Sequence, residues 1–220
     1  FFLQADHGIL DSVASRGLGD VYKRQRMAAR AATARPPPIY RKKENDGAAA
    51  CIIVSAEKAK DLKQKPAYIL GAVQGSDHRC GAPVMNASNF PSSSFASLAP
   101  RLYEMARVTP GDVDVVQSYE NFTIGVMMAV VEHGFCAPDE CNEFFQLDNL
   151  LAPNGKMPLN TSGGNLAECY MHGLGLQIEA VRQIRGQSVN QVPGVDVAIN
   201  IAGPMVHHVS SIIMGSEATV

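Results

Sequence analysis

From Glu44 onward, apolar positions follow two different periods, and the alternation between them predicts strands that alternate with helices. Continuous apolar runs predict buried strands, and positions three or four residues apart predict helices. The expected strands cover 48–55, 67–76, 113–118, 195–203 and 207–216. A short helix is expected directly after the first strand. Four further helices are expected over 92–108, 122–134, 137–147 and 165–186.

This order of elements predicts an α/β layered domain, in which helices pack on a sheet. The last two strands are joined by the short Gly203-Pro204 connection, so we expect them to be antiparallel neighbours. The sheet is then mixed, because the other strands are separated by helices.

Residues 1–43 have no consistent period. The stretch 15–25, "SRGLGDVYKRQ", looks like translated sequencing-adapter sequence, and the following residues are rich in Arg, Ala and Pro. An Arg-rich transit peptide is an alternative, but Ser enrichment is absent. We interpret 1–43 as a non-native or disordered head and 44–220 as the folded domain. We also expect the chain to be a fragment.

The composition allows a core but favours no charged partner. The chain has 220 residues, of which 46% are hydrophobic and 18% charged, as in ordinary globular proteins. A net charge of −2 gives no electrostatic case for nucleic acid or an anionic membrane. No apolar run reaches the roughly 18 residues that a membrane-spanning helix needs.

The five cysteines are scattered, and their odd number argues against a disulfide framework. A reducing cytoplasm is the expected location. Cys136 and Cys141 are the closest pair, but no second Cys or His pair completes a zinc site, so we expect no metal. Cys51 lies in the first apolar run and is expected to be buried and inert.

Three polar segments follow or precede strongly apolar elements and could meet at one edge of the sheet. They are "SYENF" (118–122), "NTSGG" (160–164) and "NIAGPM" (200–205). Read alone, "NTSGG" is a helix cap, because its polar side chains satisfy free amide groups and Gly permits an unusual turn. The same free amides could instead stabilise an enolate oxygen.

Two tyrosines belong to these segments, and each could be a packed ring or a catalytic group. Tyr119 and Tyr170 are poor bases at neutral pH unless their surroundings stabilise the phenolate. His172 follows Tyr170 by two residues, so on a regular helix the two side chains diverge by roughly 200°. They can face one site only if the helix is broken, which Gly173 and Gly175 permit. His207 and His208 are a poor metal pair.

These segments resemble motifs of the thiolase superfamily. "NTSGGNLAECYMHGLG" resembles N-x-x-G-G-x-x-x-x-x-H, "SYENF" resembles the N-E-x-F loop, and "INIAGPM" lies where thiolases carry a catalytic Cys before a Gly-rich loop. "NDGAAACIIVSAEKAKDL" (45–62) is similar to the strand that closes the N-terminal half, so 44–60 would end that half. The resemblance covers about 44–220 and implies a partial, C-terminal thiolase-like fold.

The departures from these motifs are informative. Tyr170 stands where thiolases have a catalytic His, and Asn200 stands where they have the second catalytic Cys. Tyr119 replaces the Asn of the N-E-x-F loop, whereas Glu120 and Phe122 are kept. Claisen chemistry needs a thiolate and a second Cys as acid and base, and Asn200 cannot serve as the latter.

The two tyrosines are similar to those expected in lipid-transfer-protein and sterol-carrier-protein-X-type homologues of the retro-aldolase branch. That resemblance implies cleavage of a β-hydroxyacyl-CoA into a ketone and a shorter acyl-CoA. It implies acid and base roles for Tyr119 and Tyr170, and we expect His172 to take part in catalysis by polarising or positioning. We expect substrate contacts from a second set of residues, namely Glu120, Asn160, Gly163, Gly164, Asn200 and Gly203.

The same resemblance implies no cofactor beyond the coenzyme A thioester substrate, a small OB-fold partner protein and a homodimer at full length. Two other functions stay open. One is a thiolase-like acetyl-CoA acetyltransferase with altered residues, and the other is a non-catalytic lipid or acyl-CoA binding protein. We expect the 220-residue chain alone to be inactive.

Overall fold

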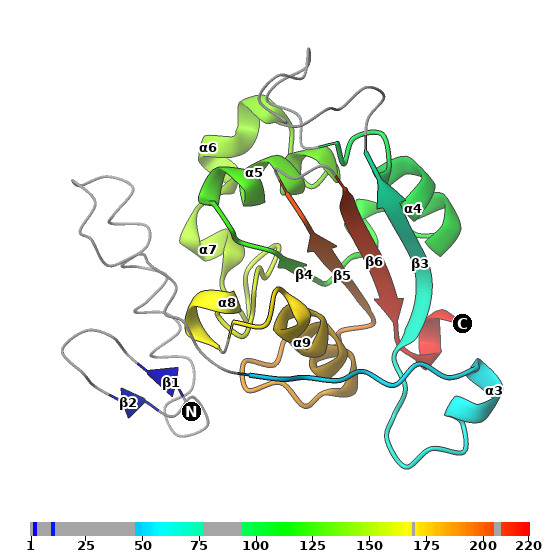
Figure 1. The fold of residues 1–220 in the computed structure, drawn as a ribbon. Helices are drawn as coiled ribbons and strands as arrows, with labels where there is room; N and C mark the ends of the chain where they lie inside the picture. Colours follow the sequence, from blue (N-terminus) through cyan, green and yellow to red (C-terminus); the bar gives the residue numbers. More distant parts are fainter. Residues whose placement is uncertain (1, 4–9, 12–46, 77–93, 169, 205–207) are drawn as a thin grey trace.

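The computed structural model describes residues 2–3, 10–11, 47–76, 94–168, 170–204 and 208–220 (Figure 1). The main sheet has the strand order β3-β6-β5-β4. Its strands are β3 (Tyr68–Gly75), β4 (Val115–Ser118), β5 (Val197–Ala202) and β6 (Val209–Gly215). A separate pair, β1 (Phe2–Leu3) and β2 (Leu10–Asp11), is antiparallel. The predicted head and the domain boundary at 43 lie almost wholly outside the described residues.

The sheet is mixed, as the sequence predicts. Strand β4 pairs with β5 in parallel, whereas β6 pairs with both β5 and β3 in antiparallel fashion. The expected antiparallel pairing of the last two strands is therefore confirmed. In the register of the parallel pair, Gln117 lies opposite Asn200 and Ser118 opposite Ile201. The carboxyl ends of β4 and β5 consequently lie at the same edge.

Helices cover both faces of this sheet (Figure 1). The α-helices are α3 (Ala56–Ala59), α4 (Ala99–Ala106), α5 (Thr123–Glu132), α6 (Cys141–Phe144), α7 (Leu147–Leu150), α8 (Gly164–Ala167) and α9 (Leu174–Arg185). Short 3-10 helices are η2 (Pro110–Asp112), η3 (Pro138–Glu140) and η4 (Glu217–Thr219). The α/β layered class is confirmed.

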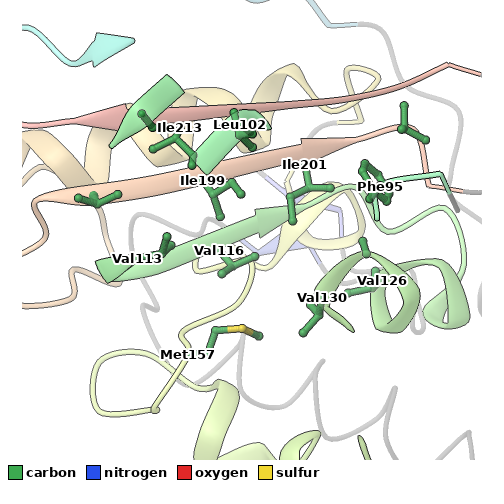
Figure 2. Packing of buried hydrophobic residues seen from close by; sticks show 14 of the residues in the cluster. Phe95, Leu102, Val113, Val116, Val126, Val130, Met157, Ile199, Ile201 and Ile213 are labelled. Carbon is green, nitrogen blue, oxygen red and sulfur yellow. The ribbon is translucent and has the colours of Figure 1, made fainter. Parts of the chain in front are cut away.

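The core has two parts, because successive residues of β4 and β5 point to opposite faces. On one face, Val116, Ile199 and Ile201 pack with residues of α4 and α5, such as Leu102 and Val130 (Figure 2). On the other face, Val115 and Ala198 pack with Ala180 and Ile184 of α9. The apolar runs predicted as strands are thus buried on both sides.

The predicted strand at 48–55 is wrong. Residues 47–55 form no strand, and Ile52 and Ile53 are 88% and 79% exposed. The buried state expected for Cys51 is also wrong, because this thiol is exposed. An apolar run becomes a strand only when a neighbouring strand takes its backbone hydrogen bonds. Within the described residues, none pairs with this segment.

The predicted continuous helix at 165–186 is broken. Helix α8 ends at Ala167, and α9 begins at Leu174. His172 and Gly173 have positive φ values of 52° and 86°, which a right-handed helix cannot contain. The break therefore follows the glycine signal in the sequence, and Tyr170 lies in the irregular segment between the helices.

Candidate active site

The first predicted loop is fixed at the end of β4 by contacts with both other loops. The Tyr119 amide donates to the Ile201 carbonyl oxygen at 2.9 Å, which extends the parallel pairing by one residue. Asn121 Nδ2 donates to the Pro204 carbonyl oxygen at 2.9 Å. The segments 118–122 and 200–204 are therefore neighbours, as expected from the parallel register.

Asn160 joins the second loop to the first. Its side-chain Oδ1 accepts from the Ser118 amide at 2.7 Å, and its Nδ2 donates to the Ser118 carbonyl oxygen at 2.9 Å. Both contacts are buried, and Asn160 has a φ of 49°, which Asn tolerates better than most residues. The structure thus gives Asn160 a clamping contact, and direct contact with substrate stays a prediction.

Glu120 occupies the start of α8. Its carboxylate accepts from the Asn165 backbone amide and, at 3.1 Å, from Asn165 Nδ2. Gly164 has a φ of 68°, and a Cβ at this position would collide with the Glu120 carboxylate, so only glycine permits this approach. The amides of Gly163 and Gly164 are bonded to Asn160 O and Ser162 Oγ. The free amides at the start of α8 are thus bonded within the protein, and the carboxylate that they receive is that of Glu120. Contact with an enolate oxygen stays a prediction.

The hydroxyl oxygens of Tyr119 and Tyr170 lie 2.6 Å apart, and their side chains are part-buried. The ring centroids are 6.5 Å apart with planes tilted by 50°. Burial raises the pKa of the Tyr119 phenol, and the hydrogen bond to Tyr170, with the negative charges of Tyr170 and Glu120, raises it further. Tyr119 therefore stays protonated at neutral pH, and either hydroxyl of the pair can donate the hydrogen bond between them.

His172 lies beside the Tyr170 ring. The imidazole centroid is 4.9 Å from the Tyr170 ring centroid, with planes tilted by 40°. The side chain is exposed to solvent. The broken helix allows this proximity, because the regular helix would turn the two side chains apart. His208 is also exposed, and His207 lies outside the described residues.

Asn200 lies in β5, opposite Gln117 of β4, and is 7% exposed. Its Nδ2 is buried and has no hydrogen-bond partner among the described residues. Gln117 Oε1, on the strand position opposite Asn200, is also buried without a partner there. Gly203 follows β5 and has a φ of 81°. An unpaired buried donor is costly, so Asn200 is suited to hold a polar atom.

The structure also places residues that sequence reasoning did not single out. Asn165 contacts Glu120 and Asn121 contacts Pro204, and both occupy unspecified (x) positions inside the quoted motifs. Glu168 forms an ion pair with Arg182 of α9, with Glu168 Oε1 3.2 Å from the guanidinium. Burial raises the pKa of Glu168, and Arg182 opposes this. Only the helix break brings Glu168 to this position.

Comparison with known families agrees with the motifs on these loops. A model described as thiolase C-terminal domain-like matches residues 76–216. The chain belongs to this family. The matched range contains β4, β5 and β6, together with Tyr119, Tyr170 and Asn200, and it begins just after the end of β3. The resemblance to the thiolase superfamily and the thiolase-like fold are therefore confirmed.

Named relatives of the chain include aldolases, lyases and acetyltransferases. A "Steroid side-chain-cleaving aldolase" of Thermomonospora curvata is 36% identical over 168 residues, which cover 76% of this chain and 42% of that protein. A "17-hydroxy-3-oxo-4-pregnene-20-carboxyl-CoA lyase" of Mycobacterium tuberculosis is 35% identical over 170 residues, which cover 74% of this chain and 42% of that protein. An "Acetyl-CoA acetyltransferase" of Methanothermobacter thermautotrophicus is 30% identical and covers 69% and 40%.

A solved structure named "Ltp2-ChsH2(DUF35) aldolase" matches with a TM-score of 0.70 and 36% identity, covering 74% of this chain and 43% of that one. The chain therefore spans less than half the length of the relatives that it matches. Of the helices in the described ranges, none is long and apolar enough to cross a membrane. The described residues also contain no cluster of His, Cys, Asp or Glu that could hold a metal ion.

Proposed function

We propose that this chain carries the acid and base of a thiolase-fold lyase, which cleaves a β-hydroxyacyl-CoA by a retro-aldol step. The observation that carries the proposal is the 2.6 Å contact between the Tyr119 and Tyr170 hydroxyls. Two of the relatives are named as a side-chain-cleaving aldolase and a CoA lyase, which supports the same reaction class. The substrate class is the coenzyme A thioester of a β-hydroxy acid with a sterol-type chain.

In this proposal Tyr170 is the base. As a phenolate that accepts a hydrogen bond from the Tyr119 hydroxyl, with the His172 ring beside it, it removes the proton from the β-hydroxyl of the substrate. The Cα–Cβ bond breaks, Cβ becomes the ketone carbon, and the electron pair of the bond forms the thioester enolate. No nucleophile, oxidant or reductant takes part. The tyrosines supply the acid and base, which Asn200, at the position of the second thiolase Cys, cannot supply.

Tyr119 is the acid in the second half of the reaction. It donates its proton to Cα of the enolate, which gives the shorter acyl-CoA. The proton that Tyr170 took from the substrate then crosses the 2.6 Å hydrogen bond to Tyr119, and both groups return to their starting states. The raised pKa of Tyr119 fits a group that holds its proton until the enolate forms.

The remaining predicted site residues bind or position. Asn200 Nδ2, buried without a partner among the described residues, is proposed to donate to the enolate oxygen. Glu120 and Asn160 hold the two loops together, and Gly203 shapes the third loop. Substrate contact by Glu120, Gly163, Gly164 and Gly203 is part of the proposal that no observation yet tests. We propose a small OB-fold partner, homodimer formation at full length and a cytoplasmic location.

To test this, the gene is expressed with all flanking coding sequence, together with an OB-fold partner. The release of ketone from a β-hydroxyacyl-CoA is then measured. Loss of a positioned acid or base lowers the rate by about 10²–10⁴-fold. We therefore expect the rate of ketone release to fall by that factor in Y170F and in Y119F. Y103F is the control, since the Tyr103 hydroxyl donates to His133 O at 2.9 Å, away from the pair. Undiminished cleavage by Y170F contradicts the proposal.

A second candidate function is acyl transfer, because one relative is named an acetyl-CoA acetyltransferase. This reaction needs a thiolate nucleophile, and of the free cysteines in the described residues, Cys51, Cys136 and Cys141, none belongs to the three loops of the site. The same full-length preparation, given acetyl-CoA and an acyl-CoA acceptor, separates the two candidates. Formation of a 3-oxoacyl-CoA with no ketone release supports acyl transfer.

A further inference from the structure

A network of buried polar side chains lies beneath the 160–164 loop, between β4 and α9. Four of its members are buried glutamine, glutamate and asparagine side chains, and a fifth is the threonine of the loop. All five are at most 4% exposed, namely Gln117, Thr161, Glu179, Gln183 and Asn190. Buried polar groups are retained at a cost in desolvation, so a network of this size calls for an explanation.

Glu179 is the centre of the network. Its Oε1 accepts from Thr161 Oγ1 at 2.6 Å, from Ser188 Oγ at 2.6 Å and from Gln183 Nε2 at 3.2 Å. Its Oε2 lies 3.9 Å from the Arg182 guanidinium. A carboxylate that is 2% exposed is stable only with such partners, and each partner is in turn fixed in place.

One arm of the network reaches Tyr119. Thr161 Oγ1 donates to Glu179 and accepts from Gln117 Nε2 at 2.9 Å. Gln117 precedes Tyr119 by two residues, so both lie on the α9 face of β4. Asn190 Nδ2 holds the Thr161 carbonyl oxygen at 2.6 Å. The Thr161 hydroxyl therefore links the 160–164 loop to both β4 and α9.

A second arm reaches Tyr170. Arg182 lies between Glu179 and Glu168, and its contact with Glu168 is 3.2 Å long. Glu168 precedes Tyr170 by two residues and lies in the irregular segment between α8 and α9. A segment without regular structure needs such side-chain contacts to hold one position. Both tyrosines are thus tied to α9 through Glu179 and its neighbour Arg182.

Resting on the function proposed above, we propose that Thr161 and Glu179 are positioning residues that set the separation of the Tyr119 and Tyr170 hydroxyls. Neither residue donates to or accepts from the tyrosine hydroxyls. Their contribution is the rigid attachment of two loops to one helix, so that proton transfer between the tyrosines occurs at hydrogen-bond distance.

The test compares T161V with T161S in the full-length protein and its partner. Valine keeps the branched shape but removes the hydroxyl that Glu179 and Gln117 share, whereas serine keeps it. A small misplacement of catalytic groups costs up to about 100-fold in rate. We expect T161V to lower kcat at least about tenfold with KM within about twofold, and T161S to restore most of kcat. If T161V does not fold, E179Q takes its place with the same expected pattern.

A second readout does not depend on turnover. We expect T161V to lower the pKa of Tyr119 in a titration followed by ¹³C-tyrosine resonances, because its hydrogen bond to Tyr170 lengthens. This result supports positioning even if the wild-type protein does not cleave the thioester, in which case only the proposed function fails. An unchanged Tyr119 titration in T161V overturns the positioning role.

S211A is the matched control. Ser211 is 1% exposed, and its Oγ contacts His133 Nε2 at 3.0 Å on the face of the sheet away from α9. Its loss leaves a buried nitrogen unpaired, as T161V does, but touches neither tyrosine loop. We expect S211A to lose stability and keep kcat. An equal loss of kcat in S211A and T161V, or a T161V effect confined to KM, contradicts the proposal.

Discussion

Gly173 lies against the ring of Tyr119: a Cβ at position 173 would be 2.8 Å from Tyr119 Cδ2. Gly173 also has a φ of 86°, which L-residues other than glycine seldom adopt. The segment that breaks the helix therefore carries Tyr170 and at the same time forms the surface on which Tyr119 rests. Both hydroxyls depend on this one irregular stretch.

The first prediction concerns G173A. The positive φ costs about 1 kcal/mol for alanine, and displacement of the Tyr119 ring adds to it. We expect urea denaturation to show a larger loss of unfolding free energy than in G186A. Gly186 has a φ of 71° and nothing within 4 Å of a Cβ, so it reports the backbone strain alone. Equal losses in the two variants would mean that the ring contact is unimportant.

The second prediction concerns the ionisation of Tyr119. Burial, the hydrogen bond to Tyr170 and the charges of Tyr170 and Glu120 raise its pKa. We expect Y170F to lower the Tyr119 pKa while leaving it above the ordinary value near 10, because burial, the largest cause, persists. Resonances of ¹³C-labelled tyrosine follow the titration. Tyr103, whose pKa burial also raises, is the internal reference and should not move.

The sequence predicted best those elements whose partners lie within the chain. The apolar runs of β5 and β6 predicted buried strands, and both are buried because β5 and β6 pair with each other and lie between helices. The run at 48–55 has a similar composition but lies exposed and unpaired among the described residues. Periodicity describes what a segment can do, and the presence of a neighbouring strand decides what it does.

The candidate site could likewise be predicted only in part, because some of its contacts depend on neighbouring elements. The convergence of the three loops could be predicted, because parallel strands place their carboxyl ends at one edge. The attachment of these loops to α9 could not be predicted. It depends on a hydrogen bond from the Thr161 hydroxyl to the Glu179 carboxylate, and these residues are 18 positions apart in the sequence. In the sequence, Glu179 reads as one polar position of an amphipathic helix. Its burial is a consequence of tertiary contacts that no local pattern records.

The third prediction concerns the clamp between Asn160 and Ser118. N160A removes the partner of the Ser118 amide and of its carbonyl oxygen, both buried. An unpaired buried group costs about 1–3 kcal/mol, so we expect a loss of about 2–4 kcal/mol in unfolding free energy. N149A is the control, since Asn149 also donates to two carbonyl oxygens but is only part-buried. A loss in N160A no larger than in N149A contradicts the clamp.

The fourth prediction concerns the pH dependence of stability through His133. Burial lowers its pKa to about 4, whereas the unfolded chain has a value near 6.5. The neutral imidazole is bonded to Ala129 O and Ser211 Oγ, and it packs on Phe95. Below pH 6.5 the unfolded state binds a proton that the folded state refuses, so stability is lost as the pH falls from about 6.5 to about 4.

The full loss is about 3 kcal/mol from this one group, since each pKa unit corresponds to about 1.4 kcal/mol. Urea denaturation of the wild-type chain and of H133Q between pH 4 and 7 measures it, because carboxylates titrate alike in both proteins and cancel in the difference. Glutamine keeps a polar group opposite Ser211 but does not gain or lose a proton between pH 4 and 7. We expect the stability of H133Q to fall less steeply with acid, and parallel curves would show that His133 is not the titrating group.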